Sequence, residues 1–260
     1  MRTHITAIAF LTATCLGTAT ARAETVTALI GEATLAHVDT AAKKVVKTVT
    51  ITGIGGRVLG IDVRPSDGLL YAVVADGTVV TVDPASGQAT PKAKLDTMPP
   101  AGVAATVDFN PVADRLRIIG ADGTNLRANV DDGKVTKDGQ LKFADADAMK
   151  GKTPKVVAGA YTNSVKGTKE TVLFDIDASG TLLRQAPPND GILNTVGALG
   201  MPTEAVAFDI LADGQGGNQA WAMMGDTLHR VDLATGKGEM VAKIVGVTGV
   251  VRDIAILPGK

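Results

Sequence analysis

Aromatic, histidine and cysteine residues are scarce in this chain of 260 residues. Phe, Trp and Tyr make up 3% of it, which is little for a protein that would stack sugars or nucleic-acid bases on ring faces. The histidines are His4, His37 and His229, whereas a zinc site or a Ser-His-Asp triad needs imidazole together with other ligands or a nucleophile. The single cysteine, Cys15, has no second thiol in the chain with which to form a disulfide.

Neither a strong net charge nor a long apolar run occurs in the body of the chain. Lys and Arg number 26 and Asp and Glu number 27, so that the net charge is −1. This balance lacks the basic field that nonspecific nucleic-acid binding requires. After the N-terminus, no run of about 20 apolar residues is present that could cross a bilayer. We therefore expect a soluble protein with no nucleic-acid partner and no membrane span.

Residues 1–23 have the pattern of a secretory signal peptide. Met1-Arg2 is a short cationic start, residues 5–16 are apolar or small, and Ala21-Arg22-Ala23 fits the small-x-small pattern at a signal-peptidase site. Cleavage after Ala23 would leave residues 24–260 as one domain in the periplasm or the medium. Without a thiol, the stability of this domain has to come from its hydrophobic core.

Two short sequence patterns recur along the remaining chain, in runs of Val, Ile, Leu and Thr interrupted by Gly, Asp, Asn and Pro, which is typical of β-strands. The first is an apolar strand with a central carboxylate, found at Asp62, Asp108 and Asp209, with Ala255 and the segment around Tyr161 as further copies. The second is a strand ending in Asp or Asn before a tight turn, at Asp39, Asp83, Asn129, Asp177 and Asp232. The side chains of the second pattern are expected to accept hydrogen bonds from the backbone of the turn, which is a structural role.

The repeat length predicts the fold. A period of about 46 residues consisting of strands and turns is typical of a β-propeller with four-stranded blades. Residues 24–260 hold five copies, so we predict an all-β protein with five blades. Because the last strand pattern, 250–257, is followed by no further strands, and the N-terminal strands in 26–51 are preceded by none, we expect the two chain ends to complete one blade together. Six blades are the alternative, since the strands of the insertion 141–155 cannot be assigned.

Several motifs also resemble those of a known family. They are Gly60-Ile61-Asp62-Val63-Arg64-Pro65, Asp108-Phe109-Asn110-Pro111, Asp114-Arg115-Leu116-Arg117, Asn125-Leu126-Arg127 and Pro187-Pro188-Asn189-Asp190-Gly191. Together they resemble the exported bacterial proteins grouped as domain of unknown function 4394, over essentially the whole mature chain. The resemblance implies an exported, propeller-like protein, and it implies no activity and no site residue.

Three carboxylates are the candidate metal ligands. In a propeller the innermost strand of each blade lines the channel, so Asp62, Asp108 and Asp209 would face one axis, with Tyr161 and Ala255 in the two remaining places. Converging carboxylate oxygens suit a hard cation such as calcium, which takes six to eight oxygen ligands. In the alternative, each carboxylate binds the backbone of the neighbouring blade or a nearby arginine, because three unpaired carboxylates would repel one another without a metal.

Three arginines, together with Tyr161, are the candidate ligand-binding residues. Alternation along the strand puts Arg115 and Arg117 on one face, with Arg127 expected nearby on the next strand. Guanidinium groups so placed could bind a carboxylate or a phosphate in bidentate fashion. In the alternative, these arginines form ion pairs with carboxylates of the blades, such as Asp108 and Asp114.

Function is less determined than fold. The chain contains no Gly-x-Ser-x-Gly, His-Glu-x-x-His or phosphate-binding glycine motif. Our leading hypothesis is a monomeric, non-enzymatic exported module that binds a small ligand or an envelope protein through loops at one mouth of the channel. The alternative is a metal-assisted, lactonase-like hydrolase in which a channel-bound cation polarises a carbonyl group or lowers the pKa of a bound water. A structural envelope component without a specific small ligand is the third hypothesis.

Overall fold

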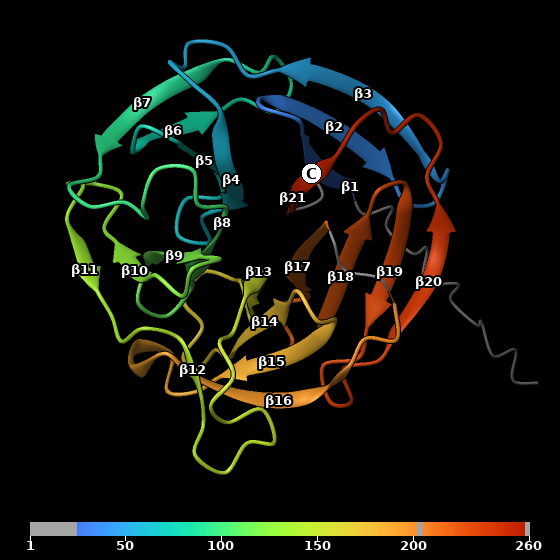
Figure 1. Cartoon of the computed structure of the whole chain (residues 1–260). Helices are drawn as coiled ribbons and strands as arrows, with labels where there is room; N and C mark the ends of the chain where they lie inside the picture. Colours follow the sequence, from blue (N-terminus) through green and yellow to red (C-terminus); the bar gives the residue numbers. More distant parts are fainter. Residues whose placement is uncertain (1–24, 202–204, 258–260) are drawn as a thin grey trace, which may run out of the picture.

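The strands of the protein form five sheets arranged in a ring around a central channel (Figure 1). The computed structural model describes residues 25–201 and 205–257, and the predicted signal peptide lies outside this part of the chain. The predicted five-bladed β-propeller is confirmed. The only helix in the described part is a short 3-10 turn, Pro188–Asp190, and no helix there is long and apolar enough to cross a membrane.

Blade 1 contains both ends of the described chain. Its strands, from the channel outwards, are β21 (Val251–Leu257), β1 (Thr25–Ile30), β2 (Thr34–Asp39) and β3 (Lys44–Thr50). β21 and β1 pair antiparallel, with Thr25 opposite Leu257 and Ile30 opposite Val251. The prediction that the N- and C-terminal segments share one blade is confirmed.

The other blades each run outwards from an innermost strand that lines the channel. The strands of blade 2 are β4 (Val58–Val63), β5 (Leu70–Val74), β6 (Thr78–Val82) and β7 (Ala89–Lys94). Those of blade 3 are β8 (Ala105–Asn110), β9 (Arg115–Gly120), β10 (Asn125–Ala128) and β11 (Val135–Lys137). Those of blade 5 are β17 (Val206–Ala212), β18 (Asn218–Met224), β19 (Thr227–Val231) and β20 (Gly238–Lys243).

Blade 4 contains the insertion whose strands the sequence left unassigned. Its regular strands are β13 (Val156–Tyr161), β14 (Leu173–Asp177), β15 (Thr181–Gln185) and β16 (Ile192–Ala198). The insertion adds the short strand β12 (Lys142–Phe143), which pairs parallel with β16 at the outer edge. The insertion therefore extends one blade to five strands and does not form a sixth blade.

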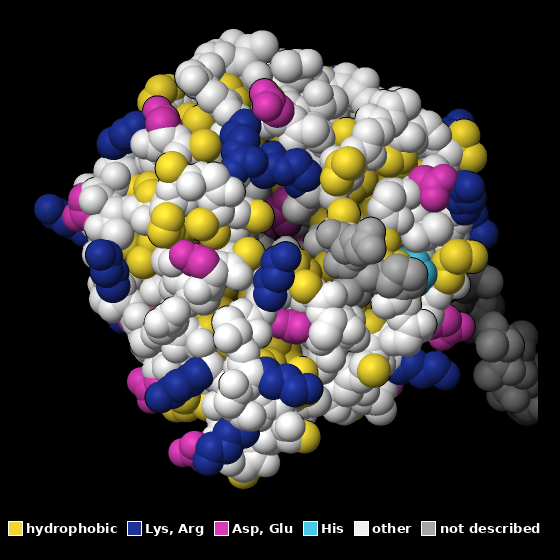
Figure 2. Space-filling model, in the orientation of Figure 1, with side chains coloured by type: hydrophobic (Ala, Val, Ile, Leu, Met, Phe, Trp, Pro, Cys, Tyr) yellow, Lys and Arg dark blue, Asp and Glu magenta, His cyan; other side chains and the backbone are white. Residues whose placement is uncertain are grey.

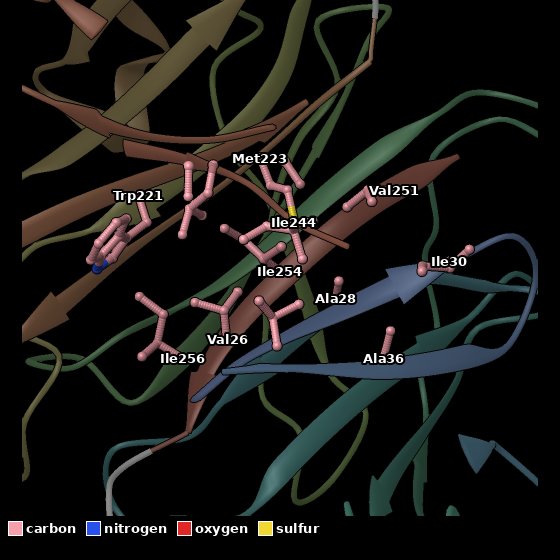
Figure 3. Close-up of a cluster of buried hydrophobic side chains, with 14 residues drawn as sticks. Val26, Ala28, Ile30, Ala36, Trp221, Met223, Ile244, Val251, Ile254 and Ile256 are labelled. Carbon is pink, nitrogen blue, oxygen red and sulfur yellow. The ribbon is translucent and has the colours of Figure 1, made fainter. Parts of the chain in front are cut away.

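The hydrophobic core is divided among the junctions between neighbouring blades, with one cluster of buried apolar side chains at each. In Figure 3, Trp221 and Met223 of blade 5 lie with Val26 and Ile254 of blade 1. Because each sheet is covered on both faces by its neighbours, the inner strands are buried almost throughout, as in β1 and β4. The stability of each blade therefore depends on the blades beside it.

The turn residues of the second sequence pattern have the predicted structural role. A backbone N–H two residues further along donates a hydrogen bond to the side chain of each, namely Asp39, Asp83, Asn129, Asp177 and Asp232. Gly87, Gly133 and Gly236 in these turns have φ angles of 77°, 76° and 78°, which favour glycine. These repeated Asp and Asn side chains serve the architecture of the blades.

Candidate functional site: carboxylates on the channel axis

The innermost strands of three blades bring the predicted metal ligands together. Asp62 on β4, Asp108 on β8 and Asp209 on β17 are buried, and one oxygen of each lies within 4.8 Å of the others. Oxygens that are 2.3–2.6 Å from a shared calcium ion are at most about 5 Å apart. The separation of these oxygens is therefore compatible with a single cation on the axis.

The same carboxylates also join neighbouring blades. Each accepts a hydrogen bond from a backbone N–H of the next innermost strand: Phe109 donates to Asp62 at 2.6 Å, Tyr161 to Asp108 at 3.0 Å and Ile256 to Asp209 at 2.7 Å. The second oxygens of Asp62 and Asp209 also accept from the N–H of the following residue, Val63 and Ile210, each at 2.6 Å. A carboxylate has about four lone-pair positions, so two backbone bonds do not exhaust it. The two arrangements that the sequence set against each other, convergence of oxygens and bonding to the backbone, are both present.

A fourth carboxylate, Asp253 on β21, lies on the same side of its strand two residues before Ala255. The N–H of Ile61 in blade 2 donates to its Oδ2 atom at 2.9 Å. Gly60 leaves room for this carboxylate, since a Cβ atom at that position would lie 2.6 Å from Asp253 Oδ2. The predicted site residues do not include Asp253, although the two-residue period of a strand puts it on the face of Ala255.

Burial controls the ionisation of these groups. It raises the pKa of Asp62 and Asp108 well above 3.8, and the charge of neighbouring carboxylates raises both further. Burial raises the pKa of Asp209 to about 6, against the effect of its backbone hydrogen bonds, and also raises that of Asp253. Near neutral pH, without a cation, we therefore expect part of this group to hold protons, which a bound cation would displace.

A funnel of about 240 Å³ leads from solvent to this group. The buried side chains of Asp62 and Asp209 lie at its inner end, and loop residues that include Pro65 and Lys166 line it further out. No histidine or cysteine lines the funnel within the described ranges. The chemistry available at its inner end is that of carboxylate oxygens.

Tyr161 does not occupy the axial place in β13. In β8, the N–H of Phe109, the residue after the axial Asp108, donates to Asp62 of the preceding blade. In β13, the N–H of Tyr161 donates in the same way to Asp108, so the axial residue of β13 is the one before it, Ala160. The side chain of Tyr161 is 1% exposed, and its hydroxyl accepts a hydrogen bond from Nε of Arg117 at 3.1 Å. The predicted alignment was wrong by one residue, and in a strand such a shift exchanges the two faces.

Arg117 and Arg127 are cross-strand partners and share one carboxylate, that of Asp138. Arg117 is 2% exposed and also donates from Nη2 to Oδ1 of Asn189 at 2.8 Å, which links blade 3 to blade 4. Nε of Arg127 donates to Oδ2 of Asp138 at 2.6 Å. The structure thus brings Arg117, Arg127 and Tyr161 together around a residue that no sequence motif indicated, and anion binding by these arginines stays a prediction.

Arg115 is not joined to this group by a hydrogen bond or ion pair within the described residues. Its Nη1 atom donates to the backbone oxygen of Asp114 at 2.9 Å. The carboxylate of Asp114 instead forms an ion pair with Arg64, with 2.7 Å between its Oδ2 atom and Nη2 of Arg64. The carboxylate of Asp131 binds the same Nη2 atom at 2.8 Å. Arg64 of blade 2 therefore pairs with two carboxylates of blade 3.

A closed ring of five blades with buried carboxylates on its axis defines the class of protein: a five-bladed β-propeller with an acidic channel. The family model described as Domain of unknown function (DUF4394) matches residues 34–255, and the chain belongs to this family. The resemblance seen in its motifs is thereby confirmed. No curated protein matches the chain.

Several solved structures match the chain, one of them with a TM-score that reaches 0.5. A structural genomics protein of unknown function from Bacteroides thetaiotaomicron is 16% identical with a TM-score of 0.50, over 93% of this chain and 68% of that one. A protein of unknown function from Bacteroides caccae is 11% identical with a TM-score of 0.45, over 91% of this chain and 100% of that one. The computationally designed Ika8 protein is 13% identical with a TM-score of 0.37, over 85% and 62% respectively. At these identities, the similarity concerns the fold alone.

Proposed function

We propose that the protein is a non-enzymatic binding module whose site is the funnel that ends at Asp62 and Asp209. The observation that supports this best is the convergence of three carboxylate oxygens, within 4.8 Å of one another, beside a funnel open to solvent. Burial raises the pKa of these carboxyl groups and so favours their neutral, protonated form, whereas a bound cation would stabilise their ionised form. The proposed cation is calcium, and the proposed partner at the rim is a small ligand or an envelope protein.

Each proposed ligand would use a lone pair that its backbone hydrogen bonds leave unused, since both oxygens of Asp62 and Asp209 already accept one N–H each. Asp62, Asp108 and Asp209 would supply one oxygen each, and water entering through the funnel would complete the six to eight ligands of calcium. The backbone bonds hold the carboxylates in place beforehand, so little ordering would be needed on binding.

Calcium titration of residues 24–260 by calorimetry, together with thermal unfolding, tests this proposal. We expect heat of binding and an increase in the unfolding temperature. Asp209→Asn removes one charge and keeps one of the two oxygens that accept from the N–H groups of Ile210 and Ile256, and it should weaken calcium binding about tenfold or more, because calcium affinity depends on the number of charged ligands. The exposed Asp190→Asn is the matched control and should bind calcium as wild type does.

Because protons compete with the cation for the carboxylates, the affinity for calcium should rise from pH 5 to pH 8. Absence of both heat and stabilisation would contradict the proposal.

The second candidate function is a metal-assisted, lactonase-like hydrolase. It is supported by the same three carboxylates and by the access that the funnel gives to solvent. The cation would polarise a substrate carbonyl or lower the pKa of a bound water. Hydrolysis of a simple lactone by calcium-loaded protein, lost in Asp209→Asn, would favour this function, whereas calcium binding without turnover would favour the binding module.

We further propose that the protein is exported to the periplasm or the medium and is a monomer. The support for export is the sequence pattern of residues 1–23. N-terminal sequencing of the protein from expressing cells should give Glu24 as the first residue, and light scattering should give the mass of one chain. A chain that retains Met1 would contradict export by this route.

A further inference from the structure

The opposite end of the channel opens into a second, smaller funnel of about 160 Å³. Figure 2 looks onto this face, where a hollow lies at the centre of the ring and Lys and Arg side chains gather beside it. Aliphatic residues from all five blades line the funnel, among them Leu59, Ala105, Val157, Val206 and Val251. Most of its lining side chains are thus aliphatic, and no carboxylate is among them, whereas Asp62 and Asp209 line the other end of the channel.

Arg252 is the charged residue that lines this funnel, among the residues described. Its Nη1 atom donates to the backbone oxygens of Gly31 at 2.9 Å and Val58 at 2.7 Å. Burial lowers the pKa of Arg252, and the positive charge of nearby Arg57 lowers it further. Arg252 therefore lies in the wall of the funnel, and Arg57, which is not among the lining residues, is near enough to repel its charge.

Neither arginine has an ion-pair partner within the described residues. The nearest acidic groups that attract Arg252 are Asp253 and Glu32. Asp253 is buried, its carboxylate is occupied by backbone N–H groups and its pKa is raised, while Glu32 is exposed to solvent. The positive charge beside the apolar wall is therefore left without close compensation, which is unfavourable for a partly buried group.

We propose that this second funnel is a binding site for a small carboxylate with an apolar body. The carboxylate would bind Arg252, because a planar guanidinium group matches its geometry, the nearby charge of Arg57 would add to the attraction, and the body would lie against the aliphatic wall. The volume of about 160 Å³ is below the 300–1,000 Å³ of sites for drug-sized ligands, so the ligand class is a short acyl or single-ring carboxylate. The site lies at the other end of the channel from the proposed cation and does not depend on it.

Titration of the ¹⁵N-labelled mature protein, followed by NMR, tests the two parts of this proposal. The probes are hexanoate, hexanol with the same body but no charge, and acetate with the same charge but almost no body, at constant ionic strength and with a calcium chelator present. We expect hexanoate to bind about tenfold more tightly than either control, since a charge-assisted hydrogen bond and a buried alkyl chain each contribute that much. Amide shifts should appear at Leu59, Val157 and Val251.

Variants of the arginines distinguish a specific site from nonspecific attraction. Arg57→Gln removes a nearby positive charge from a side chain that forms no hydrogen bond in the described structure, and it should weaken hexanoate binding about fivefold with hexanol unaffected. Arg252→Lys keeps the charge but loses the planar fork and should also weaken it. Arg184→Gln, which changes an exposed arginine on β15, is the matched control and should bind hexanoate as wild type does.

The proposal would be overturned by equal binding of hexanoate and hexanol, by unchanged binding in Arg57→Gln, or by amide shifts confined to the Asp62 end of the channel. Because calcium is chelated, a negative result here is independent of the cation site.

Discussion

Asp175 is a buried carboxyl group at the junction of blades 3 and 4. It is 0% exposed, and neither of its oxygens has a hydrogen-bond partner in the described structure. Burial raises its pKa to about 8, although the charge of Arg117 acts in the opposite direction. At neutral pH this residue is therefore protonated in the folded protein, a property that nothing in the strand sequence around it indicates.

The protonation of Asp175 predicts a dependence of stability on pH. The unfolded carboxyl group titrates near 3.8 and the folded one near 8, so the folded state binds more protons in between. The stabilising contribution is thus complete below pH 3.8 and is lost as the pH rises to about 8. Over this window, the unfolding free energy of wild type should fall relative to Asp175→Asn by up to about 1.4 kcal/mol per pH unit.

Urea denaturation at a series of pH values measures this difference. The exposed Asp190→Asn should follow the wild-type curve, since its carboxylate is in contact with solvent. Parallel curves for wild type and Asp175→Asn would show that Asp175 is ionised or that its environment is wetter than the structure implies.

At the scale of strands, neighbouring blades are held together by hydrogen bonds from the backbone of one innermost strand to the carboxylate of the preceding one. Asp253 bonds to blade 2 in this way, and the absence of a side chain at Gly60 leaves room for its carboxylate.

The sequence predicted the strands and turns well, because alternation and turn residues are local signals. It misplaced Tyr161 by one residue, because an apolar inner strand buried on both faces has no polar alternation to fix its phase.

Gly60→Ala should disrupt the junction of blades 1 and 2. The added Cβ atom would lie 2.6 Å from Asp253 Oδ2 and 2.8 Å from Cγ2 of Val107, so both would have to move. Overpacking of this kind costs about 1–3 kcal/mol, and loss of the bond to Ile61 adds to it.

Gly55→Ala is the matched control, since no heavy atom lies within 4 Å of a Cβ atom there. Thermal and urea unfolding should show a clear loss for Gly60→Ala and little change for Gly55→Ala. Equal stability of the two variants would mean that Asp253 can leave its position at no cost.

At the scale of the whole molecule, the ring is closed by the pairing of β21 with β1 in blade 1. This pairing joins chain segments from opposite ends of the sequence, and β21 also carries Asp253 to the channel. β21 contributes side chains to the core clusters on both sides of blade 1. Loss of this strand would therefore expose apolar surface at the junctions of blade 1 with blade 5 and with blade 2.

Truncation after Gly249, which removes β21, should therefore abolish cooperative unfolding and expose apolar surface to a hydrophobic dye. Truncation after Leu257 keeps the strand and should unfold as the full mature chain does. A chain that ends at Gly249 and still shows one sharp transition would mean that closure of the ring contributes little to the fold.

The sequence by itself determined the propeller class, the turns between strands and the sharing of one blade by the two chain ends, and it predicted five blades with six as the alternative. Those features follow from a repeated local pattern, and each copy carries the same signal. Only the tertiary structure excluded a sixth blade and decided which residues meet, such as Arg117 with Asp138 and Asp253 with Gly60. The members of such pairs are brought together by strand pairing and ring closure, and their contacts depend on the phase and the packing of whole blades rather than on neighbouring residues in the chain.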